Sequence, residues 1–136
     1  MKLDIIKLST KWNGLHIRKT ILEKALCDFD LDVAVALSTD THIQTLNADY
    51  RSKDKPTNVL SFPNGHGGDV ILAIETIRRE SKDMNKPLRH HIEHLIIHGC
   101  LHIAGYDHEN DADATEMEAL ETIICKNIGF DPYNYW

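Results

Sequence analysis

One short segment, residues 98–108, constrains the fold more than any other part of the chain. His98 and His102 are four residues apart, so on an α-helix their rings project from successive turns of one face. Gly105 follows three residues later and favours the end of the helix, because glycine adopts a left-handed conformation without steric cost. The chain can then turn back and bring His108 toward the first two rings. We therefore expect a helix, a glycine turn and three imidazoles that meet at one point.

Three neutral imidazoles without a fourth protein ligand nearby in the sequence indicate a metal site that keeps one position open, as catalytic zinc sites do. The spacing H-x3-H-x2-G-x2-H is also the ligand skeleton of the metzincin proteases. In such zinc proteases a glutamate general base follows the first histidine, and this chain has Gly99 at that position. A zinc peptidase is therefore a rival interpretation, but the chain lacks the general base that such an enzyme needs. Cys100 is expected to face away from the ion, on the other side of the helix.

Four histidines at four-residue spacing share the expected helix, so this spacing alone does not identify the ligand pair. Only the last two of the four lie within reach of the returning turn. We expect His90, His91 and His94 to be solvated or capping residues. Two roles are equally favoured for Asp107: a hydrogen bond to a ligating imidazole or the metal water, or a bond to backbone amides of the turn.

The composition fits one globular domain over residues 1–136, with 42% hydrophobic and 26% charged residues. Residues 1–8 alternate charged and apolar side chains and lack the apolar core of a signal peptide. No later segment approaches membrane-spanning length. The 3 cysteines form no C-x-x-C pair, which is typical of reduced thiols in a cytosolic protein. We therefore expect a single cytoplasmic domain without a membrane partner.

The net charge of −6 argues against a protein that coats nucleic acid non-specifically, because phosphate contacts need clustered lysine and arginine. It still permits a local basic groove. Residues 46–63 form a polar loop that enters a strand, and loops on a rigid scaffold commonly contact substrates. Within it, Arg51 offers a planar fork suited to phosphate. The candidates for a basic groove are Arg51, Lys53 and Lys55 and, separately, Arg78, Arg79, Lys82, Lys86 and Arg89.

Hydrophobic periodicity predicts an α+β fold, with a small mixed sheet of about four strands covered by about five helices. Residues 59–62 and 69–74 are expected to form an antiparallel hairpin, with Pro63 ending the first of its strands. The aromatic tail, residues 130–136, is expected to pack or fray. The expected strands span residues 2–8, 31–38, 59–62 and 69–74. The first three expected helices span residues 16–28, 40–50 and 75–85, and the second of them is capped by Thr39 or Asp40. A fourth helix is expected from Pro87 to the glycine turn, and a last one after a cap at Asp111 or Asp113.

Two long motifs carry a resemblance to a known family. Residues 98–108 read H-G-C-L-H-I-A-G-Y-D-H and match the pattern H-G-x-L-H-x-x-G-Y-D-H. Residues 46–63 read L-N-A-D-Y-R-S-K-D-K-P-T-N-V-L-S-F-P, and a G-D-V step follows at 68–70. Together they resemble the YbeY family of bacterial metal-dependent endoribonucleases, which are ribosomal RNA maturation factors. One departure is the short stretch between Pro63 and Gly68, where relatives often carry a longer insert.

The resemblance implies a single-strand-specific endoribonuclease that matures ribosomal RNA, especially the 3′ end of the small-subunit RNA, and acts in ribosome quality control. It also implies a small mixed sheet with helices around it. The metal ligands fall on His98, His102 and His108, and the arginine that meets RNA falls on Arg51. We therefore expect His98 and Arg51 to be catalytic and Arg51 and Lys53 to bind substrate. The expected partners are single-stranded ribosomal RNA and the ribosome or a ribosomal protein.

The expected chemistry is metal-assisted phosphodiester hydrolysis with one zinc ion per chain, which lowers the pKa of a bound water. Arg51 would neutralise charge that builds on the phosphorus centre. Because Gly99 replaces the protease base, three candidates for the general base stay open: Asp107, the hydroxide on the metal and the RNA 2′-hydroxyl. The non-enzymatic alternative is a ribosome-associated RNA-binding module in which zinc only stabilises the fold.

Overall fold

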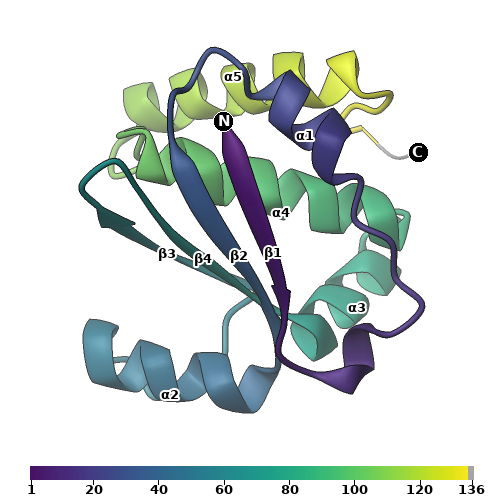
Figure 1. Ribbon diagram of the computed structural model, residues 1–136, viewed down its shortest axis with the longest axis vertical. Helices are drawn as coiled ribbons and strands as arrows, with labels where there is room; N and C mark the ends of the chain where they lie inside the picture. The colour runs from purple at the N-terminus through teal and green to yellow at the C-terminus, as the bar shows by residue number, and fades with distance from the viewer. Residues whose placement is uncertain (135–136) are drawn as a thin grey trace.

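Four strands form one sheet with the order β1-β2-β4-β3 in the computed structural model, which describes residues 1–134 (Figure 1). Strands β1, β2 and β4 run parallel, and β3 runs antiparallel to β4. The sheet is therefore mixed, and the expected hairpin is confirmed. The strands are β1 (Lys2–Lys7), β2 (Asp32–Ser38), β3 (Val59–Asn64) and β4 (Gly67–Ala73).

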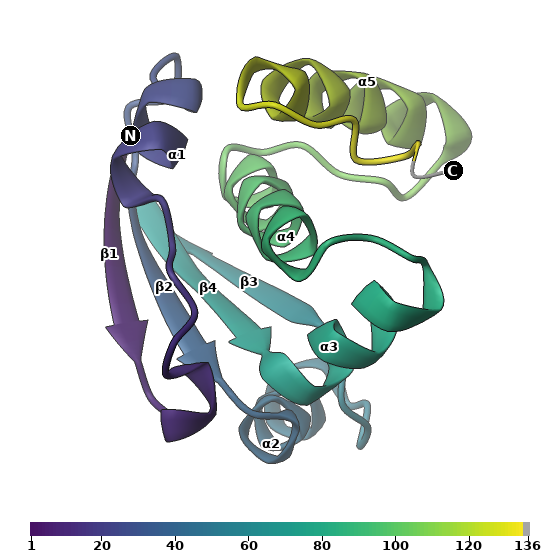
Figure 2. The ribbon, with the colours of Figure 1, turned by 90° about the vertical axis from the view of Figure 1, so that its right-hand side faces the viewer.

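Five α-helices surround this sheet, which confirms the α+β class and the approximate number of elements. Figure 2 shows α4 lying between the sheet and α5, so α4 is covered on both sides. This position explains why α4 is apolar over most of its circumference. The helices are α1 (Lys19–Ala25), α2 (Asp40–Arg51), α3 (Ile74–Asp83), α4 (Leu88–Ile103) and α5 (Asp111–Asn127), and a short 3-10 turn, η1, spans Thr10–Trp12.

The two faces of the sheet bury different side chains, because successive residues of a strand point to opposite faces. Val70 and Leu72 of β4 pack into the main core with Ile96 of α4. Ile71 and Ala73, which alternate with them, pack with Ile43 of α2. Helix α4 therefore lies on one face of the sheet and α2 on the other.

Strand β3 continues through Pro63 to Asn64, so the prediction that Pro63 ends this strand is wrong. The reason is that β3 is an edge strand, and an edge position tolerates a residue without an N–H group. The connection between the two strands is consequently shorter than the expected residues 63–68, and β4 begins at Gly67.

The first helix is shorter than the predicted span of residues 16–28. Arg18 precedes it with a non-helical ψ of 68°, and its guanidinium binds the buried carboxylate of Glu93 at 2.7 and 2.8 Å. This tertiary contact outweighs the local helical periodicity at that end. The 3-10 turn was not predicted; there Trp12 is 1% exposed and donates its indole N–H to the carbonyl oxygen of Ser38.

The helix caps follow the prediction in one case and differ in another. Thr39 caps α2, because its hydroxyl accepts a hydrogen bond from the backbone N–H of His42. Helix α5 is capped by Asn110 and not by Asp111 or Asp113. Asn110 has extended backbone angles, whereas both aspartates already lie in the first helical turn, where their charges favour the helix dipole.

The C-terminal segment packs at its start, where Phe130 is 7% exposed in the main core. Tyr135 and Trp136 of the expected aromatic tail lie outside the described residues. Within residues 1–134, no helix combines the length and apolar character that a bilayer span requires.

Candidate metal centre

The end of α4 has the geometry that the glycine predicted. Gly105 has a φ of +106°, and its N–H donates to the carbonyl oxygen of His102. The N–H of Tyr106 donates to the carbonyl oxygen of Leu101, which completes a Schellman motif. The chain therefore reverses directly after the second histidine and returns His108 to the helix.

The three predicted ligands lie together. His98, His102 and His108 each offer a ring nitrogen, and these atoms lie within 4.8 Å of one another. Nε2 of His98 and Nε2 of His102 are 3.1 Å apart. Two nitrogen ligands of a tetrahedral zinc ion, each at about 2.0 Å, are separated by about 3.3 Å. The spacing of these two rings thus fits one ion.

Hydrogen bonds on the far side of two rings decide which nitrogens face the centre. Nδ1 of His98 lies 2.6 Å from Oε1 of Glu121, and Nδ1 of His102 lies 3.0 Å from the carbonyl oxygen of Tyr106. A carbonyl and an ionised carboxylate only accept, so both Nδ1 atoms carry protons and both Nε2 atoms present lone pairs. Two facing lone pairs at this distance repel unless a cation lies between them. The donor set therefore fits a metal ion.

The protonation states agree with this arrangement. Burial lowers the pKa of His102, and the neighbouring rings of His98 and His108 lower it further, which favours the neutral form that binds metals. Burial by itself would raise the pKa of Glu121, but the close ring of His94 and hydrogen bonds from His98 and Tyr133 hold it well below its ordinary value. Glu121 is therefore ionised and accepts from the ring of His98.

Asp107 takes the second of the two roles that the sequence left open. Its Oδ1 accepts a hydrogen bond of 2.7 Å from the backbone N–H of His108. The carboxylate thus stabilises the turn that presents His108, the third candidate ligand. Cys100 is 1% exposed in the core, which confirms that it faces away from the centre.

Gly99 occupies a close contact between α4 and the sheet. A Cβ atom at this position would lie 2.8 Å from Cγ1 of Val70 and 3.1 Å from Oγ of Ser61. The helix can approach the strands this closely only without a side chain at residue 99. This packing gives a physical reason for glycine where zinc proteases carry their base, and it disfavours the peptidase interpretation.

Arg51 shares a cleft of about 560 Å³ with the three histidines, and β3 forms one wall of that cleft. Its Nη2 donates a 2.8 Å hydrogen bond to the carbonyl oxygen of Ser61, and its guanidinium carbon lies 5.4 Å from the ring centre of Phe62. Lys53 and Lys55 line a second hollow next to this cleft, and Arg51 borders both. The structure therefore brings Arg51 to the histidines and places Lys53 one hollow away.

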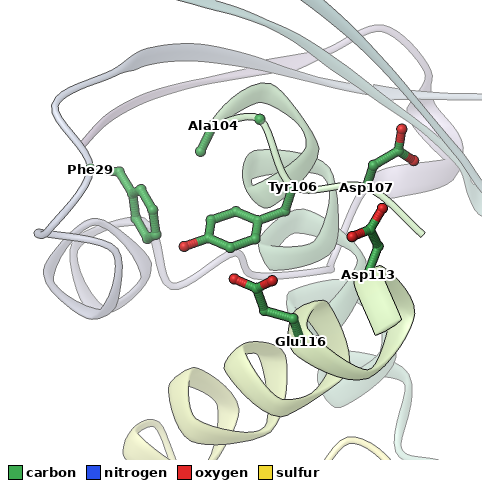
Figure 3. A pocket seen from close by; sticks show the side chains of 7 residues that line it. Phe29, Ala104, Tyr106, Asp107, Asp113 and Glu116 are labelled. Carbon is green, nitrogen blue, oxygen red and sulfur yellow. The ribbon is translucent and has the colours of Figure 1, made fainter. Parts of the chain in front are cut away.

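A third hollow lies beside the glycine turn, between Phe29 and the first turns of α5 (Figure 3). The ring of Tyr106 points toward Phe29, with ring centres 6.3 Å apart in an edge contact, and therefore packs against the core. The carboxylates of Asp107, Asp113 and Glu116 make this hollow unsuitable for phosphate. The lining residues are Phe29, Ala104, Gly105, Tyr106, Asp107, Asp113 and Glu116.

The expectation that His91 and His94 are solvated or capping residues is wrong, since they are 4% and 8% exposed. Both are buried because α4 is covered by neighbouring helices as well as by the sheet. Nε2 of His91 lies 2.9 Å from Oε1 of Glu80 on α3. His90 is half-buried and stacks on Phe130 with ring centres 4.3 Å apart.

Lys86, a candidate for a basic groove on the basis of the sequence, does not lie on the surface. It is 4% exposed, and its Nζ lies 2.7 Å from Nδ1 of His94. Glu121 was missed altogether. A signal for it exists: Glu121 is four residues from both Met117 and Cys125, on the buried stripe of α5, where a charged side chain needs partners.

Comparisons with known proteins agree with these features. The family model described as Endoribonuclease YbeY matches residues 6–129. Endoribonuclease YbeY of Bradyrhizobium diazoefficiens is 51% identical, and the match covers 76% of this chain and 64% of that protein. Endoribonuclease YbeY of Gluconobacter oxydans is 47% identical, with 74% and 62% covered. This chain thus spans less than two thirds of the length of these two relatives. The solution structure of TM1509 from Thermotoga maritima has a TM-score of 0.71 and 27% identity, with 93% of this chain and 88% of that chain covered.

Proposed function

Because the chain belongs to the YbeY endoribonuclease family, we propose that it is a metal-dependent endoribonuclease that hydrolyses phosphodiester bonds in single-stranded RNA. We propose that residues 1–136 form one catalytic domain. Its role is the maturation of ribosomal RNA, at the 3′ end of the small-subunit RNA, together with ribosome quality control. The observation that carries the proposal is the single cleft in which three convergent histidines face an arginine.

His98, His102 and His108 hold one zinc ion per chain in this proposal. Three imidazoles suit zinc, and three protein ligands leave a position for water or substrate. When bound, the ion supplies Lewis-acid chemistry and lowers the pKa of water toward neutrality. The protein orients the imidazoles for this purpose: Glu121 fixes the first ring and the carbonyl of Tyr106 fixes the second.

Arg51 binds the scissile phosphate and stabilises the charge that develops on it. A guanidinium has five N–H donors, and the bond to Ser61 on β3 uses one of them while fixing the side chain beside the cleft. Such preorganised donors contribute most where charge develops in the transition state. Lys53, in the adjoining hollow, binds the RNA backbone next to the cleaved bond.

The proposed location is the cytoplasm, and the proposed partners are ribosomal RNA and the ribosome or one of its proteins. The net charge of −6 supports a dependence on such a partner, because a negatively charged protein repels RNA at long range. A bound partner would place the RNA in the cleft.

A cleavage assay tests the proposal. Zinc-loaded protein is incubated with an end-labelled single-stranded RNA and with the same RNA in a duplex. We expect cleavage of the single strand, loss of cleavage with a chelator, and a decrease of at least about 100-fold for Arg51→Ala and His98→Ala. Arg78→Ala, an exposed arginine on α3, is the matched control and should cleave normally.

Two outcomes would overturn the proposed function. Undiminished cleavage by His98→Ala would place the activity elsewhere. Unfolding on chelation, without RNA cleavage in any condition, would support the RNA-binding module in which zinc only stabilises the fold.

A further inference from the structure

A buried carboxylate lies behind the first histidine of the metal centre. Helices α5 and α4 lie side by side (Figure 2). The Glu121 side chain of α5 is 1% exposed and contacts α4. Its Oε1 is 2.6 Å from Nδ1 of His98 and 3.3 Å from Nε2 of His94, and its Oε2 accepts from the hydroxyl of Tyr133. Glu121 therefore lies between the ring that faces the candidate metal centre and a second, buried ring.

The enclosed ring has a definite donor on its other side. Nζ of Lys86 lies 2.7 Å from Nδ1 of His94 and 3.2 Å from the carbonyl oxygen of Pro132. An ammonium group has three donors and no acceptor, so Nδ1 of His94 must accept. The proton of this neutral imidazole is then on Nε2, which faces Glu121. Burial lowers the pKa of His94, which agrees with the neutral form.

Taken together, these contacts connect Lys86 to the metal centre step by step. The lysine donates to His94, Nε2 of His94 lies 3.3 Å from Oε1 of Glu121 in an electrostatic contact without hydrogen-bond geometry, and Glu121 accepts from Nδ1 of His98. The remaining nitrogen of His98, Nε2, is then deprotonated and faces His102. Low polarity around these groups strengthens each contact and makes an unsatisfied one costly.

We propose that Lys86 and His94 are positioning residues for the metal centre, which act through Glu121 to fix the tautomer and orientation of the His98 ring. Neither residue touches the ion or the substrate. The proposal rests on the proposed role of His98 as a metal ligand, but its consequences are measured without RNA.

The alternative is that Lys86 only neutralises the buried charge of Glu121 and thereby stabilises the fold. The two accounts differ in what a change at Lys86 affects. A purely structural lysine alters the free energy of unfolding and leaves the affinity for zinc unchanged in the folded protein. A positioning lysine alters the affinity for zinc and the position of the ring proton.

The first measurement is the affinity for zinc, by competition with a chromophoric chelator, in wild type, Lys86→Met and Lys82→Met. Loss of a residue that orients a ligand commonly weakens metal binding about 10- to 100-fold. We expect a decrease of about 10-fold for Lys86→Met and no change for Lys82→Met, an exposed lysine on α3. Equal zinc affinities for folded Lys86→Met and wild type would overturn the proposal.

The second measurement uses the unmodified protein and tests the premise of the proposal, the positions of the ring protons, even if Lys86→Met does not fold. Long-range nitrogen–proton NMR spectra of the histidine rings report which ring nitrogen carries the proton. We expect the proton on Nε2 of His94 and on Nδ1 of His98, both without zinc and with it. A proton on Nδ1 of His94 would overturn the proposal. If wild type failed to bind zinc while showing the expected tautomers, the proposed function would fail instead.

Discussion

Nδ1 of His102 donates a 3.0 Å hydrogen bond to the carbonyl oxygen of Tyr106, so the last turn of α4 holds the loop that carries His108. The loop can accept this bond because Gly105 adopts a φ of +106°. Gly129 ends α5 with the same pair of backbone hydrogen bonds and a φ of +114°, far from the metal centre in the chain. The two glycines therefore form a matched pair.

Gly105→Ala and Gly129→Ala should both destabilise the protein by about 1–2 kcal/mol, since alanine is strained in this conformation. Among residues 1–134, no atom outside the adjacent residues lies within 4 Å of the added Cβ at either position. Gly105→Ala should weaken zinc binding much more than Gly129→Ala, because it displaces His108 itself. Gly129 instead precedes Pro132 and Tyr133, which contact Lys86 and Glu121 behind the centre. Urea unfolding and chelator competition measure the two effects. A zinc affinity that falls equally in both variants would show that general destabilisation is the cause.

Gly99→Ala should destabilise the protein although alanine favours a helix by about 1 kcal/mol over glycine. The new Cβ would lie 2.8 and 2.9 Å from the two methyl groups of Val70, which is fully buried. We expect a net loss of about 1 kcal/mol or more in urea unfolding. Val70→Ala in the same chain should recover part of this loss. A Gly99→Ala protein more stable than wild type would contradict the close contact between α4 and β4.

Two arginines contact the same buried carboxylate in unequal ways. Arg18 binds Glu93 through two hydrogen bonds, whereas Arg89 is 55% exposed and 4.0 Å away. Arg18→Ala should cost about 3–5 kcal/mol of stability, because it leaves a buried charge without its main partner. Arg89→Ala should leave stability nearly unchanged. Urea unfolding of both variants measures the difference, and similar losses would be inconsistent with it.

The cysteines should differ sharply in reactivity. Burial raises the pKa of the Cys100 thiol to about 12, and burial together with the charge of Glu121 raises the pKa of Cys125 to about 12. The thiolate is the reactive form, so neither thiol should react with Ellman's reagent at pH 8 in the folded protein. The exposed Cys27 should react, and Cys27→Ser should remove the native signal. Rapid modification of a second thiol before unfolding would contradict this packing.

The convergence of His98, His102 and His108 was predictable because these residues are local in the sequence. The helical spacing of His98 and His102, and the turn at Gly105, are set by backbone geometry within a few residues. Glu121 was not predictable in the same way. It reaches His98 across 23 residues, and only the packing of α5 on α4 brings the two together.

The predicted ends of helices and strands were wrong where tertiary contacts outweigh the local conformational preference of the sequence. The binding of Arg18 to Glu93 shortens α1, and the edge position of β3 lets a strand continue through Pro63. Lys86 appeared to be a surface cation because charge alone carries no information about burial. Its partners, His94 and the carbonyl of Pro132, come from α4 and the C-terminal segment.

X-ray absorption at the zinc edge tests the central claim most directly, because it reports the atoms bound to the metal. The zinc-loaded protein should show three imidazole nitrogens and one further light atom at about 2.0–2.1 Å. His98→Ala should reduce the imidazole contribution. Sulfur scattering at about 2.3 Å, or a protein that retains no zinc, would contradict a centre built from His98, His102 and His108.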